Sequence, residues 1–308
     1  MPDTGAQSPR TEHTRALLLA LFVTMLWASS WVLIRWGLED EGLRPVTFAG
    51  IRYLLAAILL AGVTAGTPSA RSAIARMRTR SWATLSMLGI VFVALAQGAQ
   101  FVAIDSQPAA TPSLVLSLTP LLVAGVSSLT IGERPGARQV MGAAFIVIGA
   151  IAYFLGDLGF TAVGMLAAGV GLLANASGAL IGRAANRDRS LPPLVVTVVS
   201  MGVGALALVV GGVAVEGWPA MSGRAWLIVL WLAGVNTALA FTLWNRSLQH
   251  LSATESAAVN NTMLIQIGLL AWAFLDEVPG VLDVLGMLAV SAGVYLATRP
   301  RVEIEVPA

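Results

Sequence analysis

The chain contains no cysteine, no lysine and only two histidines, His13 and His250, among its 308 residues. Without cysteine it can form neither a disulfide framework nor a thiolate metal site. Two histidines are too few for a histidine-built metal site, so we expect no metal catalysis and no cofactor. The sequence also lacks a Gly-x4-Gly-Lys-Ser/Thr phosphate loop, which argues against direct nucleotide hydrolysis.

Charged side chains are scarce as well. They make up 11% of the chain, whereas hydrophobic residues make up 57%. This composition leaves too little polar surface to cover a water-soluble protein of this size. Apolar runs of roughly 18 to 22 residues recur along the chain, each about long enough to cross a ~30 Å hydrocarbon core as a helix. We therefore expect an all-α integral membrane protein.

Ten of these runs are predicted to be transmembrane helices, with no soluble domain left over. The predicted spans are 16–38, 46–64, 83–103, 111–131, 139–156, 161–182, 193–215, 225–244, 256–275 and 281–297. The first run is longer than the hydrophobic region of a signal peptide and is interpreted as a retained helix. Residues 1–15 and 298–308 are then the terminal tails.

The arginine positions indicate an orientation, because short loops rich in Lys and Arg stay cytoplasmic. With the N-terminus inside, fourteen of the 18 arginines fall in cytoplasmic segments and two, Arg44 and Arg224, fall outside. This asymmetry predicts that both termini are cytoplasmic. The most basic loop, 71–80, has a composition that could bind nucleic acid or anionic lipid. We interpret it as a topology determinant at the cytoplasmic headgroups and expect no nucleic-acid partner.

The two halves of the chain look duplicated. GERPG at 132–136 recurs as DEVPG at 276–280, and at the same offset Gly142 corresponds to Gly286 and Gly149 to Gly293. Toward the start of each half, ASSWVLIR compares with ASGALIGR, which pairs Arg35 with Arg183.

Five predicted spans, an odd number, separate the two copies, so the second copy enters the membrane from the opposite face. The pattern predicts two inverted five-helix repeats, residues 16–156 and 157–297. Transporters build two similar gates around one central site from such repeats.

Four segments carry a family resemblance: the Trp27-x-Ser29-Ser30 pattern, RPVTFAGIRYLLAAILL, SLTPLLVAGVSSLTIGERPGARQVMGAAFIVIGAIAYF, and ALAFTLWNRSLQHLSATESAAVN. In order and spacing they resemble the drug/metabolite transporter superfamily, EamA type, over residues of about 16–297. The resemblance implies a ten-helix bundle that moves small metabolites by alternating access, often outward. One departure is Leu264, because the family commonly carries a proline at this place, matching Pro120. The departure weakens the expectation that both helices bend alike.

Two arginines, Arg35 and Arg52, lie inside predicted helices. Arg35 is close enough to the outer end of its helix to reach the headgroups, and it shares a face with Trp27 and Trp31. It is either an interfacial anchor or a mouth residue that attracts anionic substrate. Arg52 lies deeper, about 9 Å inside its helix, and should face the bundle interior or water. There it either forms structural hydrogen bonds, with Tyr53 as a candidate partner, or contacts the substrate.

Polar amides are predicted still deeper, where lipid offers no partners and most should face inward. Each alone fits a bond between helices. Together they suggest an uncharged polar cavity with tryptophan walls, suited to amino-acid-like, zwitterionic or neutral metabolites and drugs. The predicted substrate pathway comprises Trp27, Ser30, Trp31, Arg35, Arg52, Tyr53, Gln97, Gln100, Asn175, Ser177, Asn236, Trp244, Asn260, Asn261 and Gln266.

Pro120 is a hinge candidate, because it removes a backbone hydrogen bond in mid-helix; a fixed kink is the alternative. Proton coupling usually relies on carboxylates or histidines within the membrane. The nearest carboxylates, Asp105, Glu255 and Asp283, lie close to helix ends, where capping is common. Facilitated diffusion, exchange and proton antiport therefore all stay open.

We expect a secondary transporter in a bacterial cytoplasmic membrane that acts as an exporter and has the lipid bilayer and a small-molecule substrate as partners. A non-transporting membrane sensor or assembly protein is one alternative. An intramembrane enzyme is another, but it would need a nucleophile with a base, or Asp-rich metal motifs, and none is visible at membrane depth. The oligomeric state is open.

Overall fold

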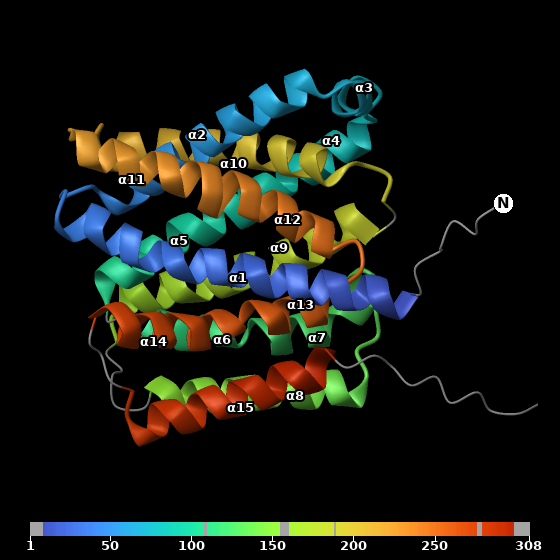
Figure 1. Ribbon diagram of the computed structural model, residues 1–308, viewed down its shortest axis with the longest axis vertical. Helices are drawn as coiled ribbons and strands as arrows, with labels where there is room; N and C mark the ends of the chain where they lie inside the picture. The colour runs from blue at the N-terminus through green and yellow to red at the C-terminus, as the bar shows by residue number, and fades with distance from the viewer. Residues whose placement is uncertain (1–8, 108–109, 155–159, 188, 276–278, 299–308) are drawn as a thin grey trace, which may run out of the picture.

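The computed structural model describes residues 9–107, 110–154, 160–187, 189–275 and 279–298, and all secondary structure in these ranges is helical (Figure 1). The helices are α1 (Pro9–Glu39), α2 (Pro45–Gly66), α3 (Pro68–Ala75), α4 (Thr79–Leu88), η1 (Gly89–Leu95), α5 (Ala96–Ser106), α6 (Ala110–Ser117), α7 (Thr119–Thr130), α8 (Ala137–Phe154), α9 (Ala162–Arg187), α10 (Pro193–Glu216), α11 (Gly223–Ala233), η2 (Gly234–Leu239), α12 (Ala240–Ser247), α13 (Ala253–Asn260), α14 (Thr262–Leu275) and α15 (Val281–Thr298).

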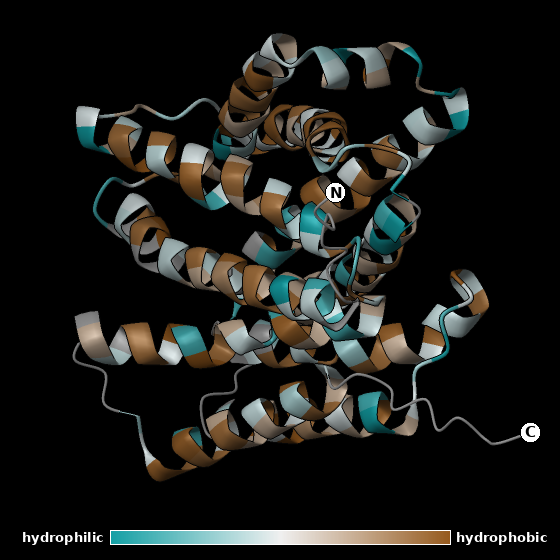
Figure 2. Cartoon of the chain, turned by 45° about the vertical axis from the view of Figure 1, so that its right-hand side comes forward, coloured by the Kyte–Doolittle hydropathy of each residue, from teal (hydrophilic) through white to brown (hydrophobic). Residues whose placement is uncertain are grey.

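The helices have the length and composition of membrane-spanning segments. Among the described residues seven helices are long and apolar enough to cross a membrane, and shorter apolar helices occupy Leu114–Thr130 and Ala137–Tyr153. Large apolar side chains such as Leu129, Leu166 and Leu227 are exposed on the sides of the bundle. Figure 2 shows hydrophobic residues along most helices and many of the hydrophilic ones toward helix ends and loops. This surface suits a hydrocarbon solvent.

Local sequence signals set several helix boundaries. Proline occupies the first turn of α2, α3 and α10, where its missing N–H costs nothing. Ser222 and Ser252 cap α11 and α13 through their side chains, and Ser252 forms a full capping box with Glu255. Gly217, with φ of 79°, ends α10.

Two π-helical segments lie at corresponding places in the two halves. The first, η1, joins α4 to α5, and the second, η2, joins α11 to α12, so that each forms the middle of a continuous helical rod. Each begins with a glycine, Gly89 or Gly234. A π turn widens the helix and is frequent at functional sites, and η2 carries two of the polar residues discussed below.

Two helical interruptions also correspond. α6 gives way to α7 at Leu118, just before Pro120, and α13 gives way to α14 at Asn261. In the second case the backbone N–H of Asn261 donates to the carbonyl of Ala258 over 3.1 Å, and the hydroxyl of Thr262 donates to that of Val259 over 2.7 Å. These tighter turns interrupt the helix without a proline. The two helices are thus interrupted at corresponding places, although Leu264 stands where the family commonly has a proline; whether both bend alike stays a prediction.

The two halves run in opposite directions. Gly142 packs against Gly293 and Gly149 against Gly286, so α8 and α15 are antiparallel neighbours along one edge of the molecule (Figure 1). Gly136, just before α8, and Gly280, just before α15, consequently lie at opposite ends of the pair. This confirms the inverted relation of the two motifs for these residues; Asp276, Glu277 and Val278 lie outside the described part of the chain.

The molecule has two distinct ends. At the first, which we call the arginine-rich end, the start of α1, the loop 131–136, the end of α9 and the start of α13 meet through the contacts His13–Glu255 and Arg183–Glu133. At the opposite end, Arg224 pairs with Asp40 over 3.0 Å, and both carboxylate oxygens of Glu216 accept backbone N–H groups at the start of α2. Both sets of contacts join one half of the chain to the other.

Candidate functional site

Arg52 of α2 is a buried cation held by neutral groups. Its side chain is 6% exposed. Its Nε donates to Thr237 Oγ1 over 2.7 Å, its Nη2 donates to the carbonyl of Asn236 over 3.4 Å, and its guanidinium lies 5.4 Å from the ring centre of Tyr53. No carboxylate of the described residues pairs with it. Arg52 faces inward, as predicted, and both of its hydrogen bonds go to η2; its role in substrate contact stays a prediction.

Asn236 lies next to this cation and is itself incompletely bonded. Its side chain is 1% exposed, and its Nδ2 donates to the carbonyl of Leu26 and, over 3.2 Å, to Ser29 Oγ. Its Oδ1 is buried without a hydrogen-bond partner. Ser30, also assigned to the pathway, donates to the carbonyl of Trp27 within its own helix. Asn236 therefore has an unused side-chain acceptor, while its backbone carbonyl accepts from Arg52.

An aromatic cluster adjoins these polar groups. The Trp27 ring centre lies 5.1 Å from those of both Phe241 and Trp244. Tyr53 meets Phe241 edge-on at 5.8 Å, and Phe92 lies 6.1 Å from the same ring. The indole Nε1 of Trp27 is buried without a partner. The cluster thus combines apolar ring surface with one unused donor.

Only some of the predicted pathway residues meet in this cluster. Trp27, Arg52, Tyr53, Asn236 and Trp244 are linked by the contacts above. Asn175 and Asn261 instead donate to carbonyls of their own helices, at Gly171 and Ala257. Gln266 donates from Nε2 to Thr24 of α1 over 3.1 Å, and its Oε1 is buried without a partner.

The remaining pathway residues are less informative. Gln97, Gln100 and Asn260 are half-buried, whereas Ser177 is exposed, and no hydrogen bond within the described residues joins any of them to the cluster. The side chains of Trp31, Arg35 and Asp105 lie outside the described part of the structure.

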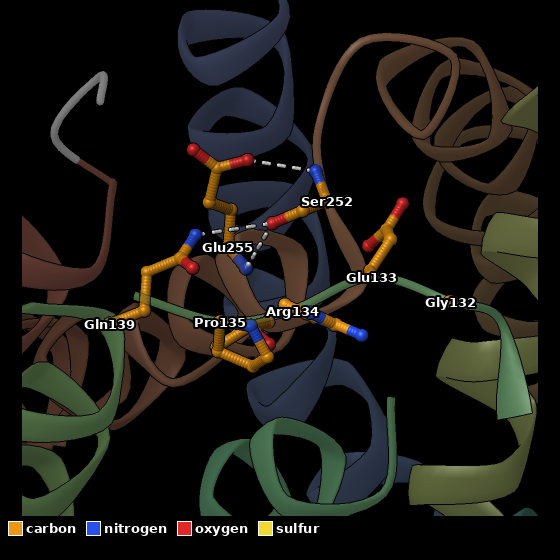
Figure 3. A pocket seen from close by; sticks show the side chains of 8 residues that line it. Gly132, Glu133, Arg134, Pro135, Gln139, Ser252 and Glu255 are labelled. Carbon is orange, nitrogen blue, oxygen red and sulfur yellow. Dashed lines mark hydrogen bonds between the residues drawn. The ribbon is translucent and has the colours of Figure 1, made fainter. Parts of the chain in front are cut away.

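A pocket of about 320 Å³ opens at the arginine-rich end, between the loop 131–136 and the start of α13 (Figure 3). Gln139 of the first half donates to Ser252 Oγ of the second half over 3.4 Å. Glu255 accepts the backbone N–H of Ser252 over 2.8 Å and contacts His13 Nε2 at 3.1 Å. Glu255, a predicted proton-coupling candidate, therefore caps α13 and ties it to α1.

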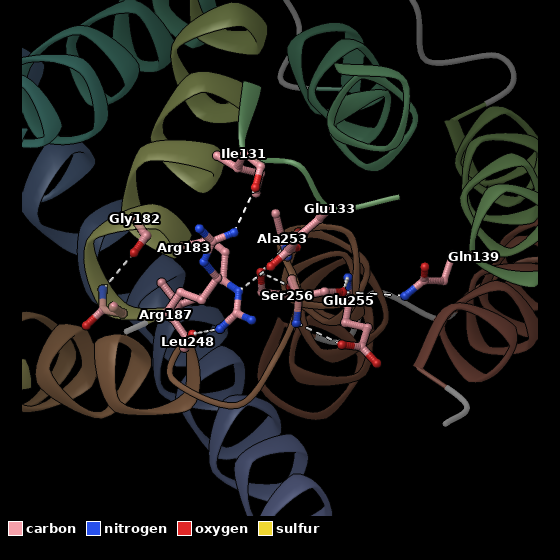
Figure 4. A network of polar contacts seen from close by, with 12 residues as sticks. Ile131, Glu133, Gln139, Gly182, Arg183, Arg187, Leu248, Ala253, Glu255 and Ser256 are labelled. Carbon is pink, nitrogen blue, oxygen red and sulfur yellow. Dashed lines mark hydrogen bonds and ion pairs between the residues drawn. The ribbon is translucent and has the colours of Figure 1, made fainter. Parts of the chain in front are cut away.

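Beside this pocket a polar network bridges the two halves (Figure 4). Arg183 Nε donates to Glu133 Oε1 over 2.6 Å, and its Nη1 donates to the carbonyl of Leu248 over 2.6 Å. The other carboxylate oxygen of Glu133 accepts the N–H of Ala253 over 3.0 Å. Arg187 donates to the carbonyl of Ile131 over 2.7 Å. Four segments from both halves are thus fastened around one carboxylate.

Another carboxylate predicted as a coupling candidate, Asp283, caps a helix. Asp283 Oδ2 accepts the N–H of Gly280 over 2.7 Å at the start of α15, which is a helix-capping contact. The side chain of Asp105 lies outside the described part of the structure. His250, in the loop before α13, contacts Arg189 and Glu12 at 3.1 and 3.5 Å. Partial burial lowers the pKa of His250 below 6.5, and the positive charge of Arg189 lowers it further.

The sequence interpretation missed several residues that the structure brings together. Glu133 and Arg183 belong to the repeat motifs GERPG and ASGALIGR, so the duplicated pattern contained a signal for them. Phe241 lies four residues after Thr237 and three before Trp244, on one helix face, which is a second usable signal. Nothing in the local sequence indicates that His13 contacts Glu255, 242 positions away.

Comparisons with known proteins agree with this architecture. The model of the EamA-like transporter family matches residues 14–155 and 160–299. A protein of Bacillus subtilis (strain 168) named "Uncharacterized transporter YvbV" is 28% identical over 130 residues, which cover 42% of this chain and 40% of that protein. A solved structure described as "Crystal structure of protein" has a TM-score of 0.76 at 20% identity, and the match covers 92% of this chain and 97% of that one. This last likeness concerns the fold alone.

Proposed function

The chain belongs to the EamA-like transporter family, and from that premise we propose that it exports a small, amino-acid-like molecule by alternating access. As a member it is an integral transporter of the cell membrane. The finer statements, namely the substrate class, the direction and the mechanism, are our proposal.

The substrate class is proposed from the chemistry around Arg52, which is the observation that carries the proposal most directly. A buried guanidinium that has no carboxylate partner among the described residues favours an anionic group nearby. The free Oδ1 of Asn236 suits an ammonium or other donor, and the free Nε1 of Trp27 suits an acceptor. The ring surface of Trp27, Phe241 and Trp244 suits an apolar body. A zwitterion with an apolar side chain meets all these conditions.

The orientation is proposed from the arginines. The loops and helix ends at the arginine-rich end carry most of the arginines of the chain. Loops rich in positive residues stay cytoplasmic. We therefore assign this end to the cytoplasm, with ten membrane spans and both termini inside. The rods 110–130, 137–154 and 253–275 complete the ten together with the seven longer helices.

Alternating access is proposed from the inverted halves and the contacts between them. Opening the cytoplasmic end would require the Glu133–Arg183 network to break, and opening the other end would require Glu216 and Arg224 to release the first half. Paired gates of this kind are what inverted repeats supply.

Counterflow in proteoliposomes tests the function. Vesicles are loaded with one unlabelled amino acid, and uptake of the same labelled compound is followed against a panel of competitors. We expect saturable uptake that zwitterionic amino acids with apolar side chains inhibit. Their carboxamide and N-acetyl derivatives, which lack one charge, should inhibit at least about tenfold less, as expected for the loss of a charge-assisted bond.

Two results would contradict the proposal in different ways. Equal inhibition by the derivatives would refute the zwitterion assignment but leave a transporter. Absence of saturable flux across the panel would favour a non-transporting sensor. Direction is read separately, from whether cells that express the protein release the substrate faster than cells that express Arg52→Ala.

A further inference from the structure

The short helix α3 differs in orientation from its neighbours. It follows α2 after one residue and precedes α4, and in Figure 1 it is seen almost along its axis while α2 and α4 run across the view. Its residue Ile74 and the following Met77 pack against the same buried cluster as Ile181 and Ala185 near the end of α9, which places the segment at the arginine-rich end. If α2 and α4 cross the bilayer, α3 lies along its surface.

One side of this segment is fixed to the bundle. Ala70 is fully buried, and Ala73, Ile74 and Met77 pack on Leu85 of α4 and on the start of α10. This packing holds α3 against the helices that carry the candidate site, because α2 bears Arg52 and α4 continues into η1. The opposite side is therefore presented in a fixed orientation.

The exposed part of the segment carries four arginines without a partner among the described residues. Arg71, Arg76, Arg78 and Arg80 are all exposed, and none of their side chains has an ion pair or hydrogen bond within the described residues. The sequence has no Asp or Glu between Glu41 and Asp105, so the segment supplies no carboxylate of its own to neutralise them. Trp82 is exposed beside them at the start of α4, as expected for a residue at the headgroup level.

Neighbouring and equivalent segments lack this arrangement. At the same end Arg183, Arg187 and Arg189 are all engaged with other groups of the chain. In the second half the connection between α10 and α11, residues 217–222, has neither a helix nor an arginine. The arginine surface is therefore an addition to one half and no consequence of the repeat.

We propose that the segment 67–82 binds the phosphate headgroups of anionic phospholipids in the cytoplasmic leaflet. The segment, with Arg71 in α3 and the other three arginines between the end of α3 and the start of α4, presents guanidinium groups that match phosphate oxygens, and the apolar side chains next to them match the acyl layer. The assignment to the cytoplasmic leaflet rests on the proposed orientation; the binding itself does not. Each basic residue near an anionic surface strengthens membrane binding by about fivefold.

The test uses the full-length protein in a neutral detergent. Its Tm is followed as phosphatidylglycerol, phosphatidylcholine or inorganic phosphate is added, and bound lipid is counted by native mass spectrometry. The test variant is Arg76→Gln/Arg78→Gln. Its matched control is Arg138→Gln/Arg246→Gln, which removes the same charge from two exposed arginines at the same end that also lack partners.

We expect phosphatidylglycerol to raise the Tm of the native protein and of the control. The test variant should need at least about tenfold more lipid for the same shift. Replacing all four arginines by lysine keeps the charge but loses the guanidinium geometry, so the response should lie between those of the native protein and the glutamine variant; this variant also covers the case in which the glutamine variant fails to fold. An equal shift in test and control variants overturns the proposal, and so does an equal shift with phosphatidylcholine or with inorganic phosphate.

A separate experiment tests the proposed orientation in the membrane. The chain has no cysteine, so Ser72→Cys introduces a single thiol on exposed α3. Labelling of this thiol by an impermeant maleimide in intact cells would refute the cytoplasmic assignment. It would leave the lipid titration in detergent unaffected.

Discussion

Gly149 and Gly286 approach one another backbone to backbone and do so reciprocally. A β-carbon on Gly149 would lie 2.6 Å from the carbonyl oxygen of Gly286, and one on Gly286 would lie 2.6 Å from the carbonyl oxygen of Gly149. Gly142 and Gly293 form the equivalent contact about two turns away along the same two helices. The repeat relates Gly142 to Gly286 and Gly149 to Gly293, so exchanging the halves turns one contact into the other. α8 and α15 therefore pack about a local twofold axis.

Adding a single methyl group at this contact should destabilise the bundle. In Gly149→Ala and Gly286→Ala the β-carbon meets backbone atoms, which cannot move aside as a side chain end can. We expect each variant to lose about 1–3 kcal/mol, the usual cost of overpacking. Thermal unfolding of the purified protein measures the effect.

The control for this prediction is Gly169→Ala in α9, where nothing lies within 4 Å of the added carbon. Helix propensity should make it neutral or more stable by up to about 1 kcal/mol. If all three variants unfold at the same temperature, the close contact does not exist in the protein.

Arg52→Ala should abolish counterflow while the protein still inserts and purifies as a single species. Thr237→Val removes the 2.7 Å bond but keeps the charge, so it should weaken transport less. Arg35→Ala, at a position predicted to lie near the outer end of its helix, should also be milder. Transport rates at saturating and subsaturating substrate distinguish the variants. Small and equal losses in all three would show that the guanidinium serves neither substrate nor site geometry.

The sequence revealed the architecture better than the site. Apolar runs and the GERPG and DEVPG motifs are local features, and they predicted helices and an inversion that the packing of Gly142 on Gly293 bears out. Arg52 was predicted to face inward because a buried cation leaves few alternatives. Its partners Asn236 and Thr237 lie more than 180 residues away in the sequence, in the π-helical segment η2, which no local sequence pattern predicts. Similarly, the side chains of Asn175 and Asn261 donate to backbone carbonyls of their own helices. Composition does not reveal this bonding pattern.

His250 should make stability depend on pH near neutrality. Its pKa is lowered by burial and by Arg189, so the unfolded chain takes up a proton at higher pH than the folded one. The corresponding stability is fully present above pH 6.5 and is lost as the pH falls through the lowered pKa. Tm measured from pH 7.5 down to about 5 should therefore fall.

His250→Gln provides the comparison, because the amide oxygen can still accept the hydrogen bond from Arg189. Its Tm should fall less over the same interval. Parallel curves for the two proteins would refute the assigned protonation behaviour, and a steeper curve for the variant would reverse its sign.

Glu133→Gln should open the arginine-rich end. The Glu133 and Arg183 side chains are 18% and 13% exposed, and the lost charge weakens the ion pair and the bond to the N–H of Ala253 together. Ala257→Cys places the chain's single thiol one turn deeper in α13, at a buried position. We expect maleimide labelling of this thiol to become about five- to tenfold faster with Glu133→Gln, as a loss of about 1–1.4 kcal/mol implies. Arg138→Gln, which removes an exposed charge that has no partner among the described residues at the same end, should leave the rate unchanged. In the Ala257→Cys protein with Glu133 intact, substrate should change the rate of maleimide labelling. A network that only fastened the loops would respond to Glu133→Gln but not to substrate. Equal labelling with and without Glu133→Gln would mean that the network does not hold this end closed.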